Sequence, residues 1–211
     1  MKSKGVLLIL SGFSGAGKGT LVKKLLDTYP EYSLSVSMTT RQPRDGEVDG
    51  VHYFFATPKQ FEEKIEQDGF IEYAQYCENY YGTPMDYVEE KLSQGKNVIL
   101  EIELQGALKV KEKYPEAVLV FVVTKSAAIL KDRLVGRGTE TMDIIEKRMK
   151  RAVEEAEYIE KYDYMVVNDD LNTCMEEIHS IIENCHRIPS NNEAFIAQMK
   201  EELKAISKGE K

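Results

Sequence analysis

Five short apolar runs recur along the chain, and segments with apolar residues at helical spacing lie between them. Runs of this length, rich in leucine, isoleucine and valine, are typical of strands buried on both faces, as in a parallel sheet. The predicted strands are Val6–Leu10, Leu34–Met38, Asn97–Ile102, Val118–Val123 and Met165–Asn168. The predicted helices are Lys18–Thr28, Met85–Gln94, Leu104–Tyr114 and Ser126–Val135. This alternation predicts an α/β fold with a doubly wound, five-stranded parallel sheet flanked by helices.

Two stretches interrupt the alternation. Residues from about 41 to 82 hold aromatic-rich short strands, Val51–Phe55 and Phe70–Tyr76, around a helix at Pro58–Gln67, which predicts a small mixed-sheet insertion. Residues from about 136 to 163 are highly charged and helical, as expected of a mobile, solvent-facing lid. We therefore assign 1–36, 84–125 and 164–211 to the core, 37–83 to the insertion and 126–163 to the lid. An amphipathic helix at Asn191–Ile206 is expected to cap the core by packing.

A glycine-rich turn joins the first predicted strand to the first predicted helix, with the sequence G-F-S-G-A-G-K-G-T over 12–20. Glycines let backbone N–H groups turn inward around an anion, and the helix N-terminus and Lys18 add positive charge. The predicted phosphate ligands are Ser14, Gly15, Ala16, Gly17, Lys18, Gly19 and Thr20. The usual pattern places a hydroxyl directly after the lysine, whereas here Gly19 intervenes, so we expect Thr20 to touch a phosphate and magnesium to be held mostly through water. The alternative is a glycine-rich turn that binds no ligand.

Composition narrows the function classes. The chain has 211 residues, of which 42% are apolar, and a formal net charge of -8, which disfavours a general nucleic-acid or anionic-membrane surface. The three cysteines (Cys77, Cys174 and Cys185) form no C-x-x-C pair and are expected to be free thiols. The histidines show no ligand spacing with them, so no zinc site is predicted. Without a long apolar run, the protein is expected to be soluble and cytoplasmic.

A second group of candidate residues follows the second predicted strand. Arg41 and Arg44, three residues apart and joined through Pro43, can close on one phosphate, because each planar guanidinium donates two hydrogen bonds to one anion. Tyr53 and Tyr81 can add phenolic donors. Arginine pairs are more often solvated surface charges, but a position just past a strand's carboxyl end favours ligand binding in an open α/β sheet.

Two acids, Glu101 and Glu103, alternate at the end of the third core strand and therefore share one face. An acid there, near the phosphate loop, can anchor magnesium-bound waters or orient Lys18. The alternative is that both glutamates merely solvate the end of a strand.

Several segments in one order resemble the guanylate kinase family, and they span the chain from about residue 5 to 186. Besides the glycine turn, they are Ser37–Phe55, Phe70–Ala74, Asn79–Thr83, Arg133–Glu140 and Val167–Asp169. The phosphate loop alone would indicate only a nucleotide-binding fold.

The resemblance implies a role for each matching residue. Arg41, Arg44, Tyr53 and Tyr81 look like ligands of the GMP phosphate. The residues that look like guanine ligands are Ser37, Glu72 and Thr83. Glu103 is expected on the guanine side of the site, and Glu101 near the metal. Three arginines match lid positions of the family: Arg133, Arg137 and Arg148. Arg151 is expected to have no role in the site. Asn168 matches the position where the family contacts adenine. The expected catalytic residues are Lys18, Arg41, Arg137 and Arg148.

Chemistry agrees with the role implied for Glu72. Guanine presents N1–H and its 2-amino group side by side, and one carboxylate can accept from both, whereas adenine offers no donor at those places. Without the motif, Glu72 would read as an ordinary exposed strand glutamate. Thr83 stands where the family commonly has serine, and it keeps the hydroxyl.

The resemblance implies an enzyme of purine nucleotide metabolism that uses Mg²⁺ to transfer the γ-phosphate of ATP to GMP or dGMP, giving GDP and ADP. The expected partners are these nucleotides, with no nucleic acid and no membrane, and the chain is expected to be a monomer or homodimer. Two alternatives remain: a kinase for another nucleoside monophosphate, and a non-catalytic module that binds protein partners through the former GMP site.

Overall fold

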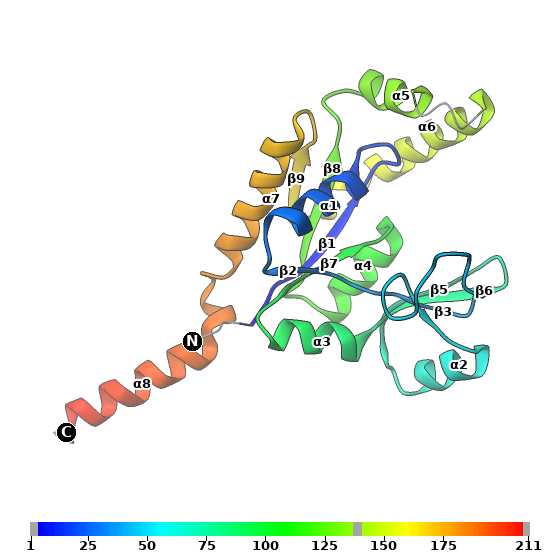
Figure 1. The fold of residues 1–211 in the computed structure, drawn as a ribbon. Coiled ribbons are helices and arrows are strands. Elements are labelled where there is room, and N and C mark those ends of the chain that lie inside the picture. The colour runs from blue at the N-terminus through cyan, green and yellow to red at the C-terminus, as the bar shows by residue number, and fades with distance from the viewer. Residues whose placement is uncertain (1–3, 137–140, 209–211) are drawn as a thin grey trace.

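The computed structural model describes residues 4–136 and 141–208, and a five-stranded parallel sheet forms its centre (Figure 1). The strand order is β2-β7-β1-β8-β9, and every pairing is parallel. The strands are β1 (Leu7–Gly12), β2 (Tyr32–Leu34), β7 (Asn97–Glu101), β8 (Val118–Val123) and β9 (Tyr164–Val167). The predicted doubly wound sheet is confirmed.

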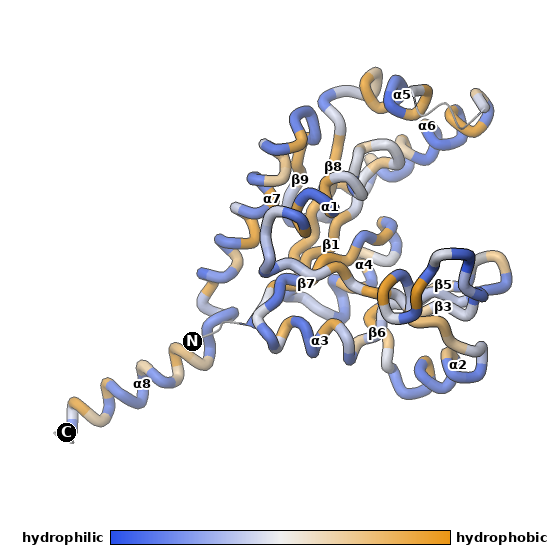
Figure 2. The backbone as a smooth tube through the Cα atoms, viewed as in Figure 1, coloured by the Kyte–Doolittle hydropathy of each residue, from blue (hydrophilic) through white to orange (hydrophobic). Residues whose placement is uncertain are grey.

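Helices cover both faces of this sheet, which is why its strands are apolar on both sides. Helices α1 (Lys18–Thr28) and α7 (Leu171–Cys185) pack on one face, and α3 (Met85–Ser93) and α4 (Leu104–Lys113) on the other. In β1, Leu8 and Leu10 point to the first face, while Leu7 and Ile9 point to the second. All six residues of β8 are buried, and Figure 2 shows apolar residues concentrated in these central strands.

The insertion forms a separate mixed sheet, as predicted. Its strands are β3 (Met38–Thr39), β4 (Phe54–Phe55), β5 (Phe70–Tyr76) and β6 (Asn79–Pro84), in the order β4-β3-β6-β5. Helix α2 (Pro58–Glu66) begins at a capping box formed by Thr57 and Gln60. Its Phe61 stacks on Phe70 and Tyr80, with ring centroids 4.3 and 5.1 Å apart, and so attaches the helix to the sheet.

Two predicted strands are wrong in extent. The strand predicted at Leu34–Met38 is two strands in different sheets, because the chain leaves the core after β2 and Met38 opens β3 of the insertion. Alternating residues continue through the connection, so the sequence pattern gives no sign of the change. In the strand predicted at Val51–Phe55, only Phe54 and Phe55 are extended in a sheet, and Val51 and His52 form a turn.

The described parts of the lid and of the C-terminal segment are mainly helical. Helix α5 (Ala127–Val135) precedes α6 (Met142–Ala156), and two short 3₁₀ helices, η1 (Ile159–Lys161) and η2 (Pro189–Asn192), precede β9 and α8 (Glu193–Ser207). The packing cap expected of the C-terminal helix is wrong: α8 has no buried residue and extends away from the body (Figure 1). Among the described residues, no helix is long and apolar enough to cross a bilayer.

Candidate active site

The phosphate loop (Gly12–Thr20) turns around a cavity of about 310 Å³ at the carboxyl end of β1. Gly15 and Gly17 have φ angles of 95° and 93°, left-handed conformations that favour glycine. The Lys18 ammonium folds back over the loop and donates to the carbonyl of Gly12 at 2.7 Å and to that of Phe13 at 3.3 Å. The residues lining the cavity are Ser14, Gly15, Gly17, Lys18, Gly19, Thr20 and Glu101. The fold therefore brings together most of the predicted triphosphate ligands.

Ala16 is a fully buried residue of the loop, and two predicted ATP ligands donate hydrogen bonds to its carbonyl. The Asn168 amide donates to it at 2.8 Å, and Arg133 donates to it at 3.3 Å and to the Asn168 carbonyl at 2.8 Å. A Cβ added at Gly17 would lie 2.6 Å from the Asn168 amide nitrogen. In this structure Asn168 and Arg133 thus fix the shape of the phosphate loop from behind.

Glu101 ends β7 and faces the same cavity as Lys18 and Thr20. Although its side chain reaches solvent, surrounding protein atoms remove part of its hydration and raise the pKa of its carboxyl, while the Lys18 charge opposes this rise. A carboxylate and a hydroxyl at one cavity are oxygen ligands of the kind that magnesium and its bound waters prefer.

On the insertion, Glu72 of β5 and Thr83 of β6 form a hydrogen-bonded pair. The Thr83 hydroxyl, which is fully buried, donates to Glu72 Oε1 at 2.7 Å. Burial raises the pKa of the Glu72 carboxyl, and the Thr83 hydroxyl works against that rise. The second oxygen, Oε2, lies 3.9 Å from where a Cβ on Gly106 would stand, so Glu72 faces the start of α4. A carboxylate fixed in this way suits a ligand with two adjacent donors.

The two arginines of the insertion surround a glutamate. Glu47 accepts from the Arg41 guanidinium at 2.8 Å and from the Arg44 backbone N–H at 2.7 Å. These contacts, led by Arg41, lower the pKa of Glu47 to about 2. The Arg41 guanidinium also lies over the rings of Tyr53 and Phe55, at 5.4 and 5.9 Å.

Two further predicted GMP ligands, Tyr53 and Tyr81, lie beside Arg41. Tyr53 and Tyr81 are in edge-to-face contact, with ring centroids 6.2 Å apart. Ser37 precedes β3, where its carbonyl accepts from the Phe54 backbone N–H at 2.8 Å. The side chain of Arg44 itself is exposed.

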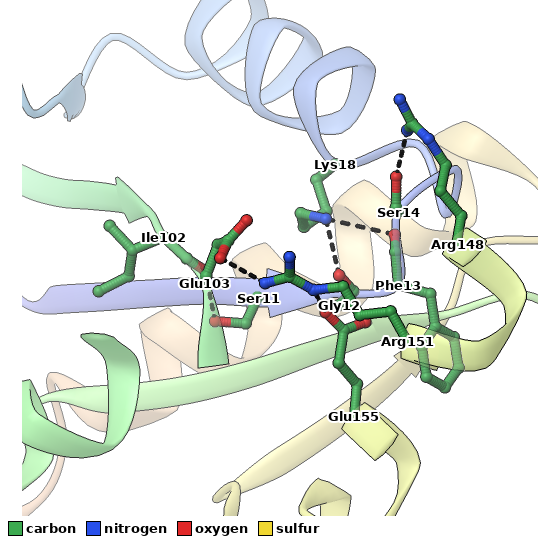
Figure 3. Close-up of polar contacts among 10 residues, drawn as sticks. All are labelled: Ser11, Gly12, Phe13, Ser14, Lys18, Ile102, Glu103, Arg148, Arg151 and Glu155. Atoms are coloured by element: carbon green, nitrogen blue, oxygen red, sulfur yellow. Dashed lines mark hydrogen bonds and ion pairs between the residues drawn. The ribbon is translucent and has the colours of Figure 1, made fainter. Parts of the chain in front are cut away.

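Two arginines of α6 reach the core (Figure 3). Arg148 donates to the Ser14 hydroxyl of the phosphate loop at 2.5 Å. One turn later, Arg151 bonds Glu103, which precedes α4, at 2.5 Å and Glu155 of its own helix at 3.2 Å. Arg137, predicted to act with Arg148, lies outside the described residues.

Glu47 and Arg151 are contacts of the site that the sequence did not assign. Arg151 is not a bystander, because it ties the lid to Glu103. Glu47 follows the two arginines in one turn, and an acid so close to an arginine pair is the signal that could have identified it.

Comparisons with known proteins identify the family of the chain. The family model described as guanylate kinase matches residues 4–185. A guanylate kinase of Clostridioides difficile is 50% identical over 201 residues, which cover 95% of this chain and 98% of that protein. One from Caldanaerobacter subterraneus subsp. tengcongensis is 47% identical over 198 residues, covering 93% and 96%. The crystal structure of guanylate kinase from Anaplasma phagocytophilum matches with a TM-score of 0.64 at 32% identity, covering 87% of each chain. The chain belongs to the guanylate kinase family.

Proposed function

We propose that this protein is a guanylate kinase, which transfers the γ-phosphate of ATP to GMP or dGMP and releases ADP and GDP. The observation that carries the proposal is the pairing of two sites in one chain. A phosphate-loop cavity lies at the end of β1, and the half-buried carboxylate of Glu72, which accepts from the buried Thr83 hydroxyl, faces the start of α4.

The side chains would divide the work of phosphoryl transfer by position. The phosphate loop and Lys18 would hold the β- and γ-phosphates of ATP. The phosphate of GMP would be bound by Arg41, Arg44, Tyr53 and Tyr81. Guanine would be bound by Glu72 and Thr83, with Ser37 and Glu103 beside them. Because a GMP phosphate oxygen is already an anionic nucleophile, no general base is needed.

The negative charge that spreads over the transferring phosphoryl group must be stabilised by cations. Lys18 and the lid arginines Arg148 and Arg137 would supply them, together with Arg41 from the acceptor side. Arg133 and Asn168 would hold the loop through their hydrogen bonds to the Ala16 carbonyl. Asn168 would also contact adenine.

The residues around the loop fit a magnesium ion. Thr20 and Glu101 border the cavity and would hold the ion mainly through its bound waters. When bound, Mg²⁺ neutralises phosphate charge. Burial raises the pKa of the Glu101 carboxyl, and the positive charge of Lys18 opposes that rise.

Transfer to GMP rather than to water requires closure. We infer that the insertion, 37–83, and the lid, 126–163, move as units against the core and exclude water when both nucleotides are bound. ATP hydrolysis is therefore expected to be slow without GMP, and rapid hydrolysis without an acceptor would contradict this inference.

A substrate panel tests the proposed function. ADP formation from ATP and Mg²⁺ would be measured with GMP, dGMP, AMP, CMP and UMP. Only the two guanine nucleotides should be good acceptors, and Lys18→Ala should remove most of the turnover. Glu72→Gln should lower kcat/KM for GMP by about 10–100-fold, because the amide offers one acceptor where guanine needs two.

The exposed Glu62 of α2 provides the matched control, since Glu62→Gln removes the same charge from the insertion without touching the site. Equal rates with AMP and GMP would favour a kinase for another monophosphate. GMP binding without any transfer would favour a non-catalytic module.

A further inference from the structure

Away from the nucleotide sites, two carboxylates and an imidazole gather where α7 passes the connection between α1 and β2. His179 and Glu183 are four residues apart on α7 and therefore share a face, and Glu31 comes from the α1–β2 connection. One ligand atom from each of the three residues lies within 4.8 Å of the other two. It is the one such group of histidine, cysteine or acidic side chains among the described residues.

The charges of this group are not balanced by basic side chains. Among the described residues, neither Glu31 nor Glu183 forms an ion pair with a lysine or arginine. All three side chains are half-buried, so water screens the repulsion between the carboxylates only in part. A cation between them would remove that repulsion.

The imidazole is held in place by two tyrosines. The Tyr29 ring stacks on His179 with centroids 3.8 Å apart and an angle of 14° between the planes. The buried Tyr32 hydroxyl lies 3.1 Å from His179 Nδ1. The Tyr32 oxygen can accept a hydrogen bond from Nδ1–H when the imidazole carries its proton there. That tautomer leaves the other ring nitrogen as a lone-pair donor, the arrangement found around metal-bound histidines.

We propose that Glu31, His179 and Glu183 form a binding site for a borderline divalent cation of the Zn²⁺ type. An imidazole with two carboxylates favours such ions over Mg²⁺, which prefers oxygen ligands alone. Bonds of about 2.0–2.2 Å to one zinc ion bring its ligand atoms to within about 3.5 Å of each other. Ligand atoms that lie within 4.8 Å of one another can reach this spacing through small side-chain movements, and water would fill the fourth position. Because Tyr32 is the first residue of β2, the site lies toward the amino end of the sheet, away from the phosphate loop, and its role is to fasten α7 to the α1–β2 connection.

Calorimetric titration of nucleotide-free protein with Zn²⁺ tests the proposal, with Co²⁺ absorption as a spectroscopic probe of the ligands. Wild type should bind one Zn²⁺ per chain with micromolar affinity and gain thermal stability. Glu183→Gln and His179→Gln should each weaken binding more than about tenfold. Tyr32→Phe, which removes only the partner of Nδ1, should weaken it by about 10-fold or more. GMP kinase turnover of all three variants should remain, which verifies their folding.

Glu177→Gln is the matched control, because it removes the same charge from an exposed position about 200° around α7 from His179. This variant should bind Zn²⁺ like wild type. The proposal is overturned if wild type binds no Zn²⁺ at 100 μM, or if Glu183→Gln binds it unchanged. The second result would also place the ion elsewhere, for example at Glu101. If His179→Gln fails to fold, Glu183→Gln alone decides, since Glu183 lacks the aromatic contacts of the histidine.

Discussion

At the scale of single residues, the arginine pair of the insertion is held by a carboxylate where the acceptor phosphate is proposed to bind. Glu47 bonds both the Arg41 guanidinium and the Arg44 backbone. It thereby helps to hold the Arg41 guanidinium over the Tyr53 ring. If GMP binds as proposed, its phosphate must share or replace this partner, and the affinity of the site for phosphate would then reflect a competition between two anions.

The same pair predicts a pH dependence of stability. The pKa of Glu47 is about 2 in the folded protein, below its ordinary value of 4.5, so the unfolded chain takes up the proton first as the pH falls. The stabilisation is therefore complete above about pH 4.5 and is lost as the pH falls toward 2. Melting of wild type and Glu47→Gln should differ most above pH 5 and converge as the pH approaches about 2. Glu66→Gln, which changes an exposed acid of α2, should show no such convergence; a pH-independent difference for Glu47→Gln would refute the assignment.

The buried hydroxyl of Thr83 makes a second prediction at this scale. Thr83→Val keeps the shape but removes the donor to Glu72, so the pKa of Glu72, already raised by burial, should rise further. Because guanine needs the ionised carboxylate, KM for GMP should increase about tenfold. As the pH is lowered, KM for GMP should also begin to rise at a higher pH in Thr83→Val than in wild type. Steady-state kinetics from pH 5 to 8 measures both effects. Thr83→Ser keeps the hydroxyl and should behave like wild type; identical profiles for the valine and serine variants would exclude the proposed role.

At the scale of elements, α6 is held to the core by two arginines that differ in their partners. Arg148 bonds the phosphate loop, whereas Arg151 bonds an exposed glutamate. Exposed ion pairs contribute at most about 1 kcal/mol, while a cation aimed at transferring charge contributes several. We predict that Arg148→Ala lowers kcat about 100-fold or more and that Arg151→Ala lowers it less than 10-fold.

Lys150→Ala provides the control for this comparison, because Lys150 is exposed on the same helix between the two arginines. Its kcat should equal that of wild type. Rates of ADP formation at saturating ATP and GMP decide the comparison. Equal losses for the two arginine variants would mean that α6 acts as a whole, through its attachment to the core.

Some elements of the fold could be predicted from the sequence, and others could not. The phosphate loop was predictable because its glycines, Lys18 and flanking strand and helix are contiguous, and β8 because every position is apolar. The break between β2 and β3 was not, because Leu34, Val36 and Met38 alternate as one strand would. The contact of Arg151 with Glu103 was not predictable either, since it depends on where the lid meets α4. Glu72 was identified as a site residue by the resemblance to the family, because its sequence pattern does not distinguish it from the other acidic residues.

At the scale of the whole molecule, the functions lie at separate places on one sheet. The phosphate loop and Glu101 lie at the carboxyl ends of β1 and β7, where the lid and insertion also converge through Glu103 and Glu72. The proposed cation site joins α7 to the start of β2, toward the other end. A ligand there would change stability without touching the nucleotides, so thermal and kinetic measurements report on the two regions independently.

The last helix lies outside both regions. None of the residues of α8 is buried, and Phe195 and Leu203 are 49% and 59% exposed. The amides of Asn191 and Asn192, by contrast, bond carbonyls at the end of α7. A chain that ends after Asn192 should therefore keep kcat and both KM values within about twofold and melt within about 2 °C of wild type.

Kinetics, melting and light scattering of the two chains test this prediction together. A truncated chain that melts more than about 5 °C lower would contradict it, because a helix without buried side chains cannot account for that loss within one chain. A simultaneous fall in mass from dimer to monomer would identify a second copy as the partner that covers α8. An unchanged mass and unchanged melting would instead mean that α8 contributes nothing to the stability of the kinase.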